Sequence, residues 1–244
     1  MSRTRLILVA LLTVLAVGVV TSASATEPPK KCGGKANTVP AYCVEGLQLE
    51  NAKGEPASAE VEGTYGVSMF KSTIGTVKVE IECKKGKSSG DIEDGIGRTV
   101  GKSMTSNTFE ECKVLKPANC KLTASNENKI KTAELQGELA LTAGRIEDKL
   151  APPESGLADI SIEGKESSCV IAEVGKPKIF EVAGSQLCEI DKTNLEAETE
   201  ALTHKIICKA LGGSLKIGTN GAEMTSEATV KLTSGKKWSV KEST

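Results

Sequence analysis

Alternation of apolar and polar side chains is the clearest pattern along this chain. Between Thr76 and Lys85 the apolar positions Val77, Val79, Ile81 and Cys83 alternate with Lys78, Glu80, Glu82 and Lys84. A period of two residues predicts a β-strand with one buried and one solvated face. Similar runs recur at Phe109–Leu115, Ala158–Glu163, Lys178–Val182, Leu202–Lys209, Ser214–Ile217, Thr229–Thr233 and Lys237–Lys241. Many short strands separated by turn residues predict an all-β, mainly antiparallel fold, either a sandwich or barrel-like.

Turn and helix signals complete this prediction. The Gly/Ser/Lys run Lys84–Gly90 predicts an exposed loop, and Asn220-Gly221 predicts a hairpin turn. Lys129–Leu141 contains helix-forming residues, but it is interrupted by a glycine, and Asn194–Leu202 has room for one or two helical turns. Pro152-Pro153 ends any regular element. We therefore expect at most short helices.

The N-terminal segment predicts export. Arg3 and Arg5 precede an apolar run from Leu6 to Val20, and Ala23-Ser24-Ala25 is a small-x-small cleavage site. This is the layout of a secretory signal peptide covering residues 1–25. The apolar run is short for a membrane span, and no second such run follows. We expect a protein that is secreted, extracellular or on the exterior of the cell envelope, without a membrane span after cleavage.

Composition divides the rest of the chain into two parts. Residues 26–59 are rich in Gly and Pro and contain Cys32 and Cys43, which is typical of a disulfide-closed N-terminal segment. Residues 60–244 are interpreted as one β-rich domain, within the size range of single all-β domains.

Cysteine is the residue type that carries the clearest chemistry. The eight cysteines are Cys32, Cys43, Cys83, Cys112, Cys120, Cys169, Cys188 and Cys208. In an exported protein an even number of cysteines indicates disulfides. No pair is spaced C-x-x-C and His204 is the only histidine, so the usual zinc sites are excluded and no metal or other cofactor is expected.

Position along the chain favours one set of disulfide pairs among the 105 that eight cysteines allow. Cys32 and Cys43 enclose a short flexible loop. Cys83 ends the best strand and Cys112 lies on the next strong one, and sequential strands are usually adjacent. Cys188 and Cys208 flank one strand, which leaves Cys120 with Cys169. An alternative pairs Cys112 with Cys120 across a turn that contains proline.

Charge and aromatic content remove further classes. The chain has 31 Lys+Arg against 32 Asp+Glu, so the basic surplus that nucleic-acid binding requires is missing. It has only 1 Trp, 2 Tyr and 3 Phe in 244 residues. Since aromatic rings supply much of the contact energy in most cores, disulfides carry more of the stability here.

Several catalytic and binding motifs are matched only in part. Gly95–Ser103 lacks the first glycine of a phosphate loop, because Ile96 stands there. Ser68–Lys71 has the S-x-x-K spacing of penicillin-interacting enzymes without a helical context. The acidic run at Asp91 has Gly95 where a calcium loop needs a ligand. His204 lies in phase with Leu202, Ile206 and Cys208, which predicts a partly buried structural role. No catalytic residue is predicted.

One resemblance emerges from the spacing of the motifs. The chain contains Ile81-Glu82-Cys83, Gly90-Asp91-Ile92, Phe109-Glu110-Glu111-Cys112-Lys113-Val114, Cys120 and the run from Ile130 to Leu139. This layout resembles exported, cysteine-containing, β-rich actinobacterial proteins of unknown function. The match covers roughly residues 32–150 and, more loosely, 160–182. The resemblance implies secretion and a β-rich scaffold, and it implies no catalytic residue.

Two functional classes remain after these exclusions. The first is an exported, non-enzymatic binding or envelope-associated module that recognises a protein or a cell-surface ligand. The second is a secreted, glycosidase-like hydrolase that uses paired carboxylates, which would require two facing carboxyl groups in a concave site. The missing catalytic motifs favour the first class.

Overall fold

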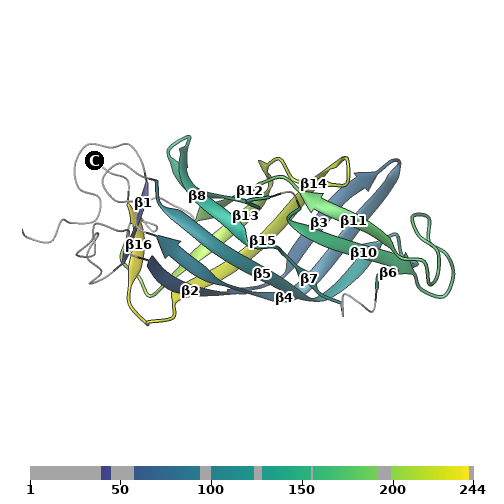
Figure 1. The fold of residues 1–244 in the computed structure, drawn as a ribbon, viewed down its shortest axis with the longest axis horizontal. Helices are drawn as coiled ribbons and strands as arrows, with labels where there is room; N and C mark the ends of the chain where they lie inside the picture. Colours follow the sequence, from purple (N-terminus) through teal and green to yellow (C-terminus); the bar gives the residue numbers. More distant parts are fainter. Residues whose placement is uncertain are drawn as a thin grey trace, which may run out of the picture.

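The computed structural model describes residues 40–44, 58–93, 100–123, 128–154, 156–191 and 199–241. These residues form β-strands and contain no helix, which confirms the all-β prediction (Figure 1). The strands are β1 (Ala41–Val44), β2 (Ser58–Tyr65), β3 (Ser68–Ile74), β4 (Val77–Glu93), β5 (Lys102–Lys116), β6 (Cys120–Leu122), β7 (Ile130–Lys131), β8 (Leu135–Thr142), β9 (Arg145–Ala151), β10 (Ala158–Gly164), β11 (Lys178–Ala183), β12 (Gln186–Ile190), β13 (Thr203–Gly213), β14 (Lys216–Ile217), β15 (Asn220–Leu232) and β16 (Trp238–Lys241).

Eight of these strands close into a ring that we call the first barrel. Hydrogen-bonded neighbours follow the order β13, β12, β9, β8, β5, β4, β2 and β15, and β15 pairs back with β13. Every pairing in the ring is antiparallel. The barrel-like alternative of the sequence prediction is therefore the one that the structure adopts.

The same long strands continue into a second closed unit, the second barrel. Here β4 and the start of β15 pair with β3, β15 also pairs with β14, and the order continues through β11 and β10. The gap between β10 and β5 is closed by β7 and by a bridge between Thr132 and Ala158. β4, β5 and β15 thus run through both barrels, as the slanted strands of Figure 1 show.

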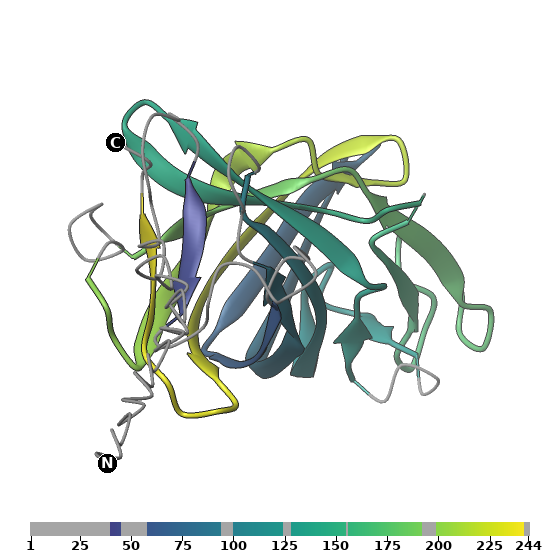
Figure 2. The same cartoon turned by 60° about the vertical axis from the view of Figure 1, so that its left-hand side comes forward.

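A separate two-stranded ribbon, β1 with β16, lies at the end of the first barrel (Figures 1 and 2). Tyr42 of β1 and Trp238 of β16 are both buried there, 2% and 1% exposed. They pack against apolar residues of the barrel wall, among them Val61, Ile92 and Leu139. We call this ribbon the cap. It shows that part of the predicted N-terminal segment, residues 26–59, joins the packed structure.

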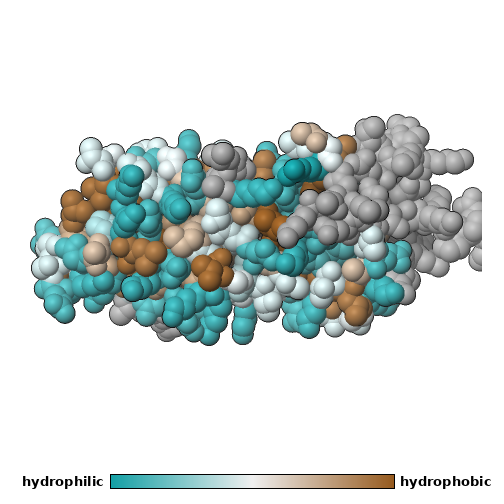
Figure 3. Space-filling view, turned by 180° about the vertical axis from the view of Figure 1, so that it is seen from behind, coloured by the Kyte–Doolittle hydropathy of each residue, from teal (hydrophilic) through white to brown (hydrophobic). Residues whose placement is uncertain are grey.

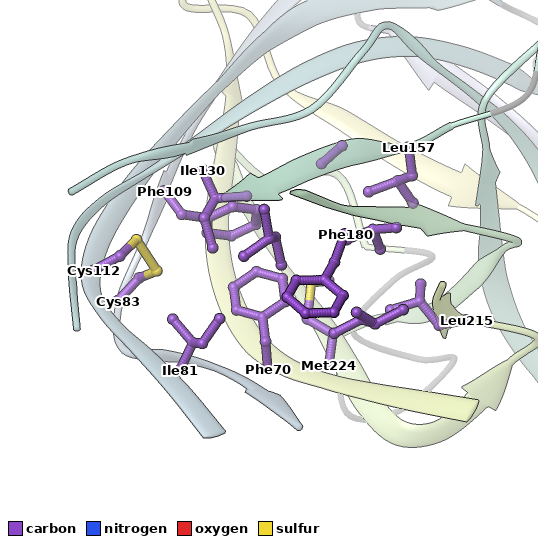
Figure 4. Packing of buried hydrophobic residues seen from close by; sticks show 14 of the residues in the cluster. Phe70, Ile81, Cys83, Phe109, Cys112, Ile130, Leu157, Phe180, Leu215 and Met224 are labelled. Carbon is purple, nitrogen blue, oxygen red and sulfur yellow. A yellow bond between two sulfur atoms is a disulfide. The ribbon is translucent and has the colours of Figure 1, made fainter. Parts of the chain in front are cut away.

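The second barrel holds the densest apolar core. Phe70, Phe109, Phe180 and Met224 converge on its centre together with Ile81 and Leu215 (Figure 4). The rings of Phe70 and Phe109 meet edge to face at 5.1 Å, a favourable aromatic geometry. All three phenylalanines of the chain lie in this one cluster.

The prediction of an exposed loop at Lys84–Gly90 is wrong, because this segment lies inside β4. Its small residues face the first barrel's interior, where space is short. A Cβ on Gly90 would lie 1.9 Å from the carbonyl oxygen of Met104, and one on Gly86 would lie 2.9 Å from that of Thr108. The glycines therefore permit close strand contact, although in the sequence they are indistinguishable from loop glycines.

The predicted hairpin at Asn220-Gly221 exists, but its turn lies two residues earlier. Ile217 pairs with Asn220, so the two turn residues are Gly218 and Thr219. Gly218 has a φ of 59°, which glycine adopts at low cost. The helix-compatible segment Lys129–Leu141 forms β7 and most of β8, while residues 194–198 lie outside the described residues.

Candidate functional site

Three of the four predicted disulfides are confirmed. Cys83 pairs with Cys112 between β4 and β5, Cys120 with Cys169, and Cys188 with Cys208 between β12 and β13. The alternative link between Cys112 and Cys120 is therefore not formed. Cys43 is buried on β1, and its predicted partner Cys32 lies outside the described residues, so that pairing stays a prediction.

The interior of the first barrel contains an acidic side chain that no sequence motif indicated. Asp148 lies on β9 and is 6% exposed. Its Oδ2 accepts hydrogen bonds from the hydroxyl of Tyr42 at 3.1 Å and from that of Ser103 at 3.0 Å. Its Oδ1 is buried without a hydrogen-bond partner. Gly137 makes room for this group, since a Cβ there would lie 2.4 Å from Oδ1.

Burial controls the acidity of Asp148. Loss of hydration raises the pKa of its carboxyl to about 6, and the hydrogen bonds from Ser103 and Tyr42 only partly offset this. Nearby, the Tyr65 hydroxyl donates to Asn107 Oδ1 at 3.0 Å, and burial raises the pKa of Tyr65. A pKa near 6 is typical of a general acid, but this carboxyl is enclosed by the barrel wall and the cap.

Neither of the two largely buried carboxylates, Asp148 and Glu189, is hydrogen-bonded to another carboxyl group among the described residues. The groups that hydrogen-bond to Asp148 are hydroxyls, and no second carboxyl is among them. Glu189 is also largely buried, but it accepts hydrogen bonds from Arg145 and Lys209. Although burial raises its pKa, these two cations bring it below the usual range. Asp148 therefore has a raised pKa, but its carboxyl is buried. The charge of Glu189 is neutralised by its two cationic partners.

His204 is more deeply buried than its sequence pattern predicted. It is 2% exposed, whereas Leu202, which was expected to share its face, is 56% exposed because it precedes β13. Its Nδ1 lies 2.5 Å from Asp191 Oδ2 and its Nε2 2.7 Å from the carbonyl oxygen of Trp238. Both ring nitrogens are therefore occupied, and the predicted structural role fits this geometry.

The partial motifs are not brought together by the fold. Ser68 is buried and Lys71 is exposed, because an odd separation on β3 places them on opposite faces. Lys102 and Ser103 lie at the start of β5, and residues 94–99 of the phosphate-loop candidate are outside the described residues. Asp91 is exposed on β4, and Gly95 lies outside the described residues. The described residues contain no group of three or more potential metal ligands.

Two shallow grooves cross the outer walls, and each carries a row of alternating charges. One, of about 460 Å³, is lined by Glu93, Lys102, Glu138 and Lys149, which are successive register partners on β4, β5, β8 and β9. The other, of about 790 Å³, is lined by Glu223, Lys71 and Glu80, again successive partners. Opposite charges on facing strands stabilise a sheet and neutralise each other. Neither row therefore concentrates charge of one sign for an ionic ligand.

Exposed apolar side chains gather at the end of the molecule away from the cap. Of seven large hydrophobic residues that are exposed among those described, three lie close in sequence: Val170 (67%), Val174 (47%) and Ile179 (66%). They belong to the β10–β11 connection and the start of β11, which we call the apolar loop (165–179). Figure 3, seen from behind, shows hydrophobic residues at the end opposite the grey segments.

The apolar loop is held firmly to its surroundings. Cys169 is bonded to Cys120, and Asn119 donates from Nδ2 to the carbonyl of Ser168 at 2.8 Å. The Lys165 ammonium donates to the carbonyl of Ala118 at 2.7 Å. These contacts join the loop to the turn that follows β5. The exposed side chains are therefore presented in a fixed arrangement, which lowers the entropy lost on binding.

Comparison with known proteins adds no relative. No family model, no curated protein and no solved structure matches the chain. The described part of the chain also contains no helix with the length and apolar character needed to cross a membrane.

Proposed function

We propose that this protein is an exported, non-enzymatic binding module that docks a partner protein on its apolar loop. The observation that carries the proposal is the exposure of Val170, Val174 and Ile179 on a loop fixed by the Cys120–Cys169 disulfide. Apolar side chains grouped on a rigid surface mark interaction sites, since their burial by a partner releases water.

The charges around the loop favour a protein over a lipid surface. The loop carries both Lys165, Lys176 and Lys178 and the acidic residues Glu166 and Glu173, and Glu173 is paired with Lys176 at 2.6 Å. A centre of apolar side chains with a rim of both charge signs is the usual layout of a protein interface. An anionic membrane would instead be attracted by lysines without intervening carboxylates.

Export is supported by the covalent structure. The three disulfides are consistent with an extracellular protein. The signal-peptide pattern of residues 1–25 and the resemblance to exported actinobacterial proteins of unknown function point in the same direction.

A crosslinking experiment followed by a binding measurement tests the docking surface. A photoreactive amino acid is placed at Val170 of the oxidised protein, which is then irradiated with the surface and secreted proteins of the producing cells. The captured protein is purified and titrated calorimetrically with the wild type and with the Val170→Asp/Ile179→Asp double variant. We expect at least a tenfold loss of affinity for the double variant, because two charges would be desolvated in an apolar contact.

Val67→Asp is the matched control, since Val67 is equally exposed (58%) but lies between β2 and β3. It should bind like the wild type. Equal binding by the double variant, or an adduct formed as well from position 67, would remove the apolar loop as the docking surface.

The hydrolase alternative is tested separately with the oxidised protein and a panel of polysaccharide, ester and peptide substrates. The binding proposal expects no turnover. Reproducible turnover that is abolished by changing one carboxylate, with Asp148→Asn as the first variant, would replace it by the paired-carboxylate alternative.

A further inference from the structure

The cap is joined to the first barrel by a small number of polar contacts. The Tyr42 hydroxyl donates to Asp148, and the Trp238 carbonyl accepts from His204. The backbones of Ala201 and Trp238 exchange two hydrogen bonds of 3.0 and 2.9 Å, and the amide of Gly101 donates to the carbonyl of Pro40 at 3.1 Å. Two titratable side chains, on β9 and β13 of the ring, therefore contact the cap.

This interface is incompletely hydrogen-bonded. Six buried polar side-chain atoms of the described residues have no partner, and three of them lie here: Asp148 Oδ1, Trp238 Nε1 and Ser239 Oγ. Each would gain a hydrogen bond to water if the cap moved away, so closure of the cap forgoes this hydration. The apolar contacts of Tyr42 and Trp238 oppose that loss.

Asp148 links the position of the cap to protonation. The closed cap excludes water from its carboxyl, and this loss of hydration is the main reason for its pKa of about 6. Removal of the cap would rehydrate the group and return its pKa toward the ordinary value of 3.8. Because the open state then binds the proton more weakly, the closed state is favoured at low pH and loses its advantage as the pH rises through 6.

His204 makes the second side-chain contact with the cap. Its two nitrogens face two acceptors, the Asp191 carboxylate and the Trp238 carbonyl, so both contacts are hydrogen bonds only when both nitrogens carry hydrogen. The singly protonated ring can serve one acceptor only. Its ring also packs edge-on against Trp238, with 4.4 Å between centroids. A change at His204 therefore acts directly on Trp238 of β16.

We propose that the β1–β16 ribbon is a proton-dependent cap, closed while Asp148 holds its proton and released as this group loses it. The groups that surround Asp148 are Tyr42 of β1, Ser103 of β5 and, through its electrostatic influence, Tyr65 of β2. Around His204 they are Asp191 after β12 and Trp238 of β16.

Hydrogen exchange of the intact, oxidised protein measures the opening of the cap. The amides of Gly101, Ala201 and Trp238 are bonded across its boundary, whereas that of Thr132, which follows β7, is bonded to the carbonyl oxygen of Asn107 and not to the cap. The difference between the two pKa values of Asp148, in the closed and open states, sets the size of the effect. It predicts that the protection factors of the three cap amides fall about 30-fold between pH 4.5 and pH 7.5. The protection factor of Thr132 should change much less, because its opening does not hydrate Asp148.

Three variants test the role of Asp148. Asp148→Asn should reduce the fall at least fivefold. Asp91→Asn, which changes an exposed carboxylate on β4, is the control and should leave the fall unchanged. Tyr42→Phe keeps the ring but removes one donor to Asp148, and it should lower cap protection even at acidic pH.

The proposal is overturned if the wild-type cap amides show no fall, or if Thr132 shows the same fall, since the event would then be global unfolding. It is also overturned if Asp148→Asn retains the wild-type dependence. If this variant does not fold, an unchanged pH dependence in Tyr42→Phe, with undiminished cap protection, would have the same consequence.

Discussion

The two barrels share three strands but fill their interiors in opposite ways. The second barrel contains all three phenylalanines, Phe70, Phe109 and Phe180, together with Met224. The first buries Asp148, Ser103 and Asn107 beside apolar residues of its wall, and it is closed by a separate ribbon that carries Tyr42 and Trp238. The second barrel therefore rests on aromatic packing, and the first depends more on buried hydrogen bonds and on the cap. This difference predicts where stability resides and which barrel responds to pH.

The largest effect should come from the aromatic core. Phe109→Ala removes the ring that contacts both Phe70 and Tyr65, each at 5.1 Å between centroids, and it should lower the free energy of unfolding by about 3–5 kcal/mol. Urea denaturation measures this loss. Val67→Ala, at an exposed position, should cost less than about 0.5 kcal/mol. Comparable losses in the two variants would contradict the assignment of the core.

The next effect concerns the buried acid and has a defined sign. The folded-state pKa of Asp148 is raised from 3.8 to about 6, so its contribution to stability is complete below pH 3.8 and is lost as the pH rises through 6. Between pH 4 and pH 7 the wild type should therefore lose about 2 kcal/mol relative to Asp148→Asn. Thermal or urea unfolding of both proteins at several pH values gives this difference. A constant difference would show that Asp148 does not titrate in this range.

A third test compares two glycines on strands. In Gly137→Ala the new Cβ would lie 1.9 Å from Ser103 Oγ, so we expect a loss of about 1–3 kcal/mol from crowding in the first barrel. Gly221→Ala is the matched control, because no atom lies within 4 Å of its Cβ position. It should be neutral or slightly stabilising. Equal destabilisation by both changes would indicate a backbone effect instead of crowding.

The smallest effect on stability is expected for a charge on the outer face of the sheet. Glu80→Lys places a third cation between Lys71 and Lys116, its register partners. Since all three side chains contact solvent, the loss in free energy of unfolding should stay below about 1 kcal/mol. It should be smaller in 0.5 M salt. A loss that is independent of salt would show that packing, and not charge, is responsible.

The sequence predicted the second barrel better than the first. Val79, Ile81 and Cys83 alternate with charged residues in a pattern that indicates both the strand and its buried face. The Cys83–Cys112 disulfide followed from the order of these strands. Gly86 and Gly90 were misread as loop residues because a glycine that admits a close neighbour has the same sequence signal as one in a turn.

The buried acid could not be recognised for a different reason. Asp148 stands between Ile146 and Leu150 and shares their buried face, but the continuous charged run Glu147-Asp148-Lys149 hides this alternation in the sequence. Its burial results from Tyr42, 106 residues away, and from Ser103, 45 residues away. Such a contact depends on the closure of the barrel and on the cap, which no local pattern encodes. The apolar loop was missed similarly, since exposure of Val170 is a property of the folded surface.

The pairing of β1 with β16 also constrains the order in which the chain can fold. It joins Tyr42 to Val240, so nearly the whole described chain must be in place before the ribbon can form. The hairpin of β3 and β4, by contrast, closes over a few residues. Because long loops are entropically costly to close and contacts distant in sequence form slowly, the cap is expected among the last elements to assemble. Until then the apolar end of the first barrel is open to other chains, and folding helpers would act at this stage.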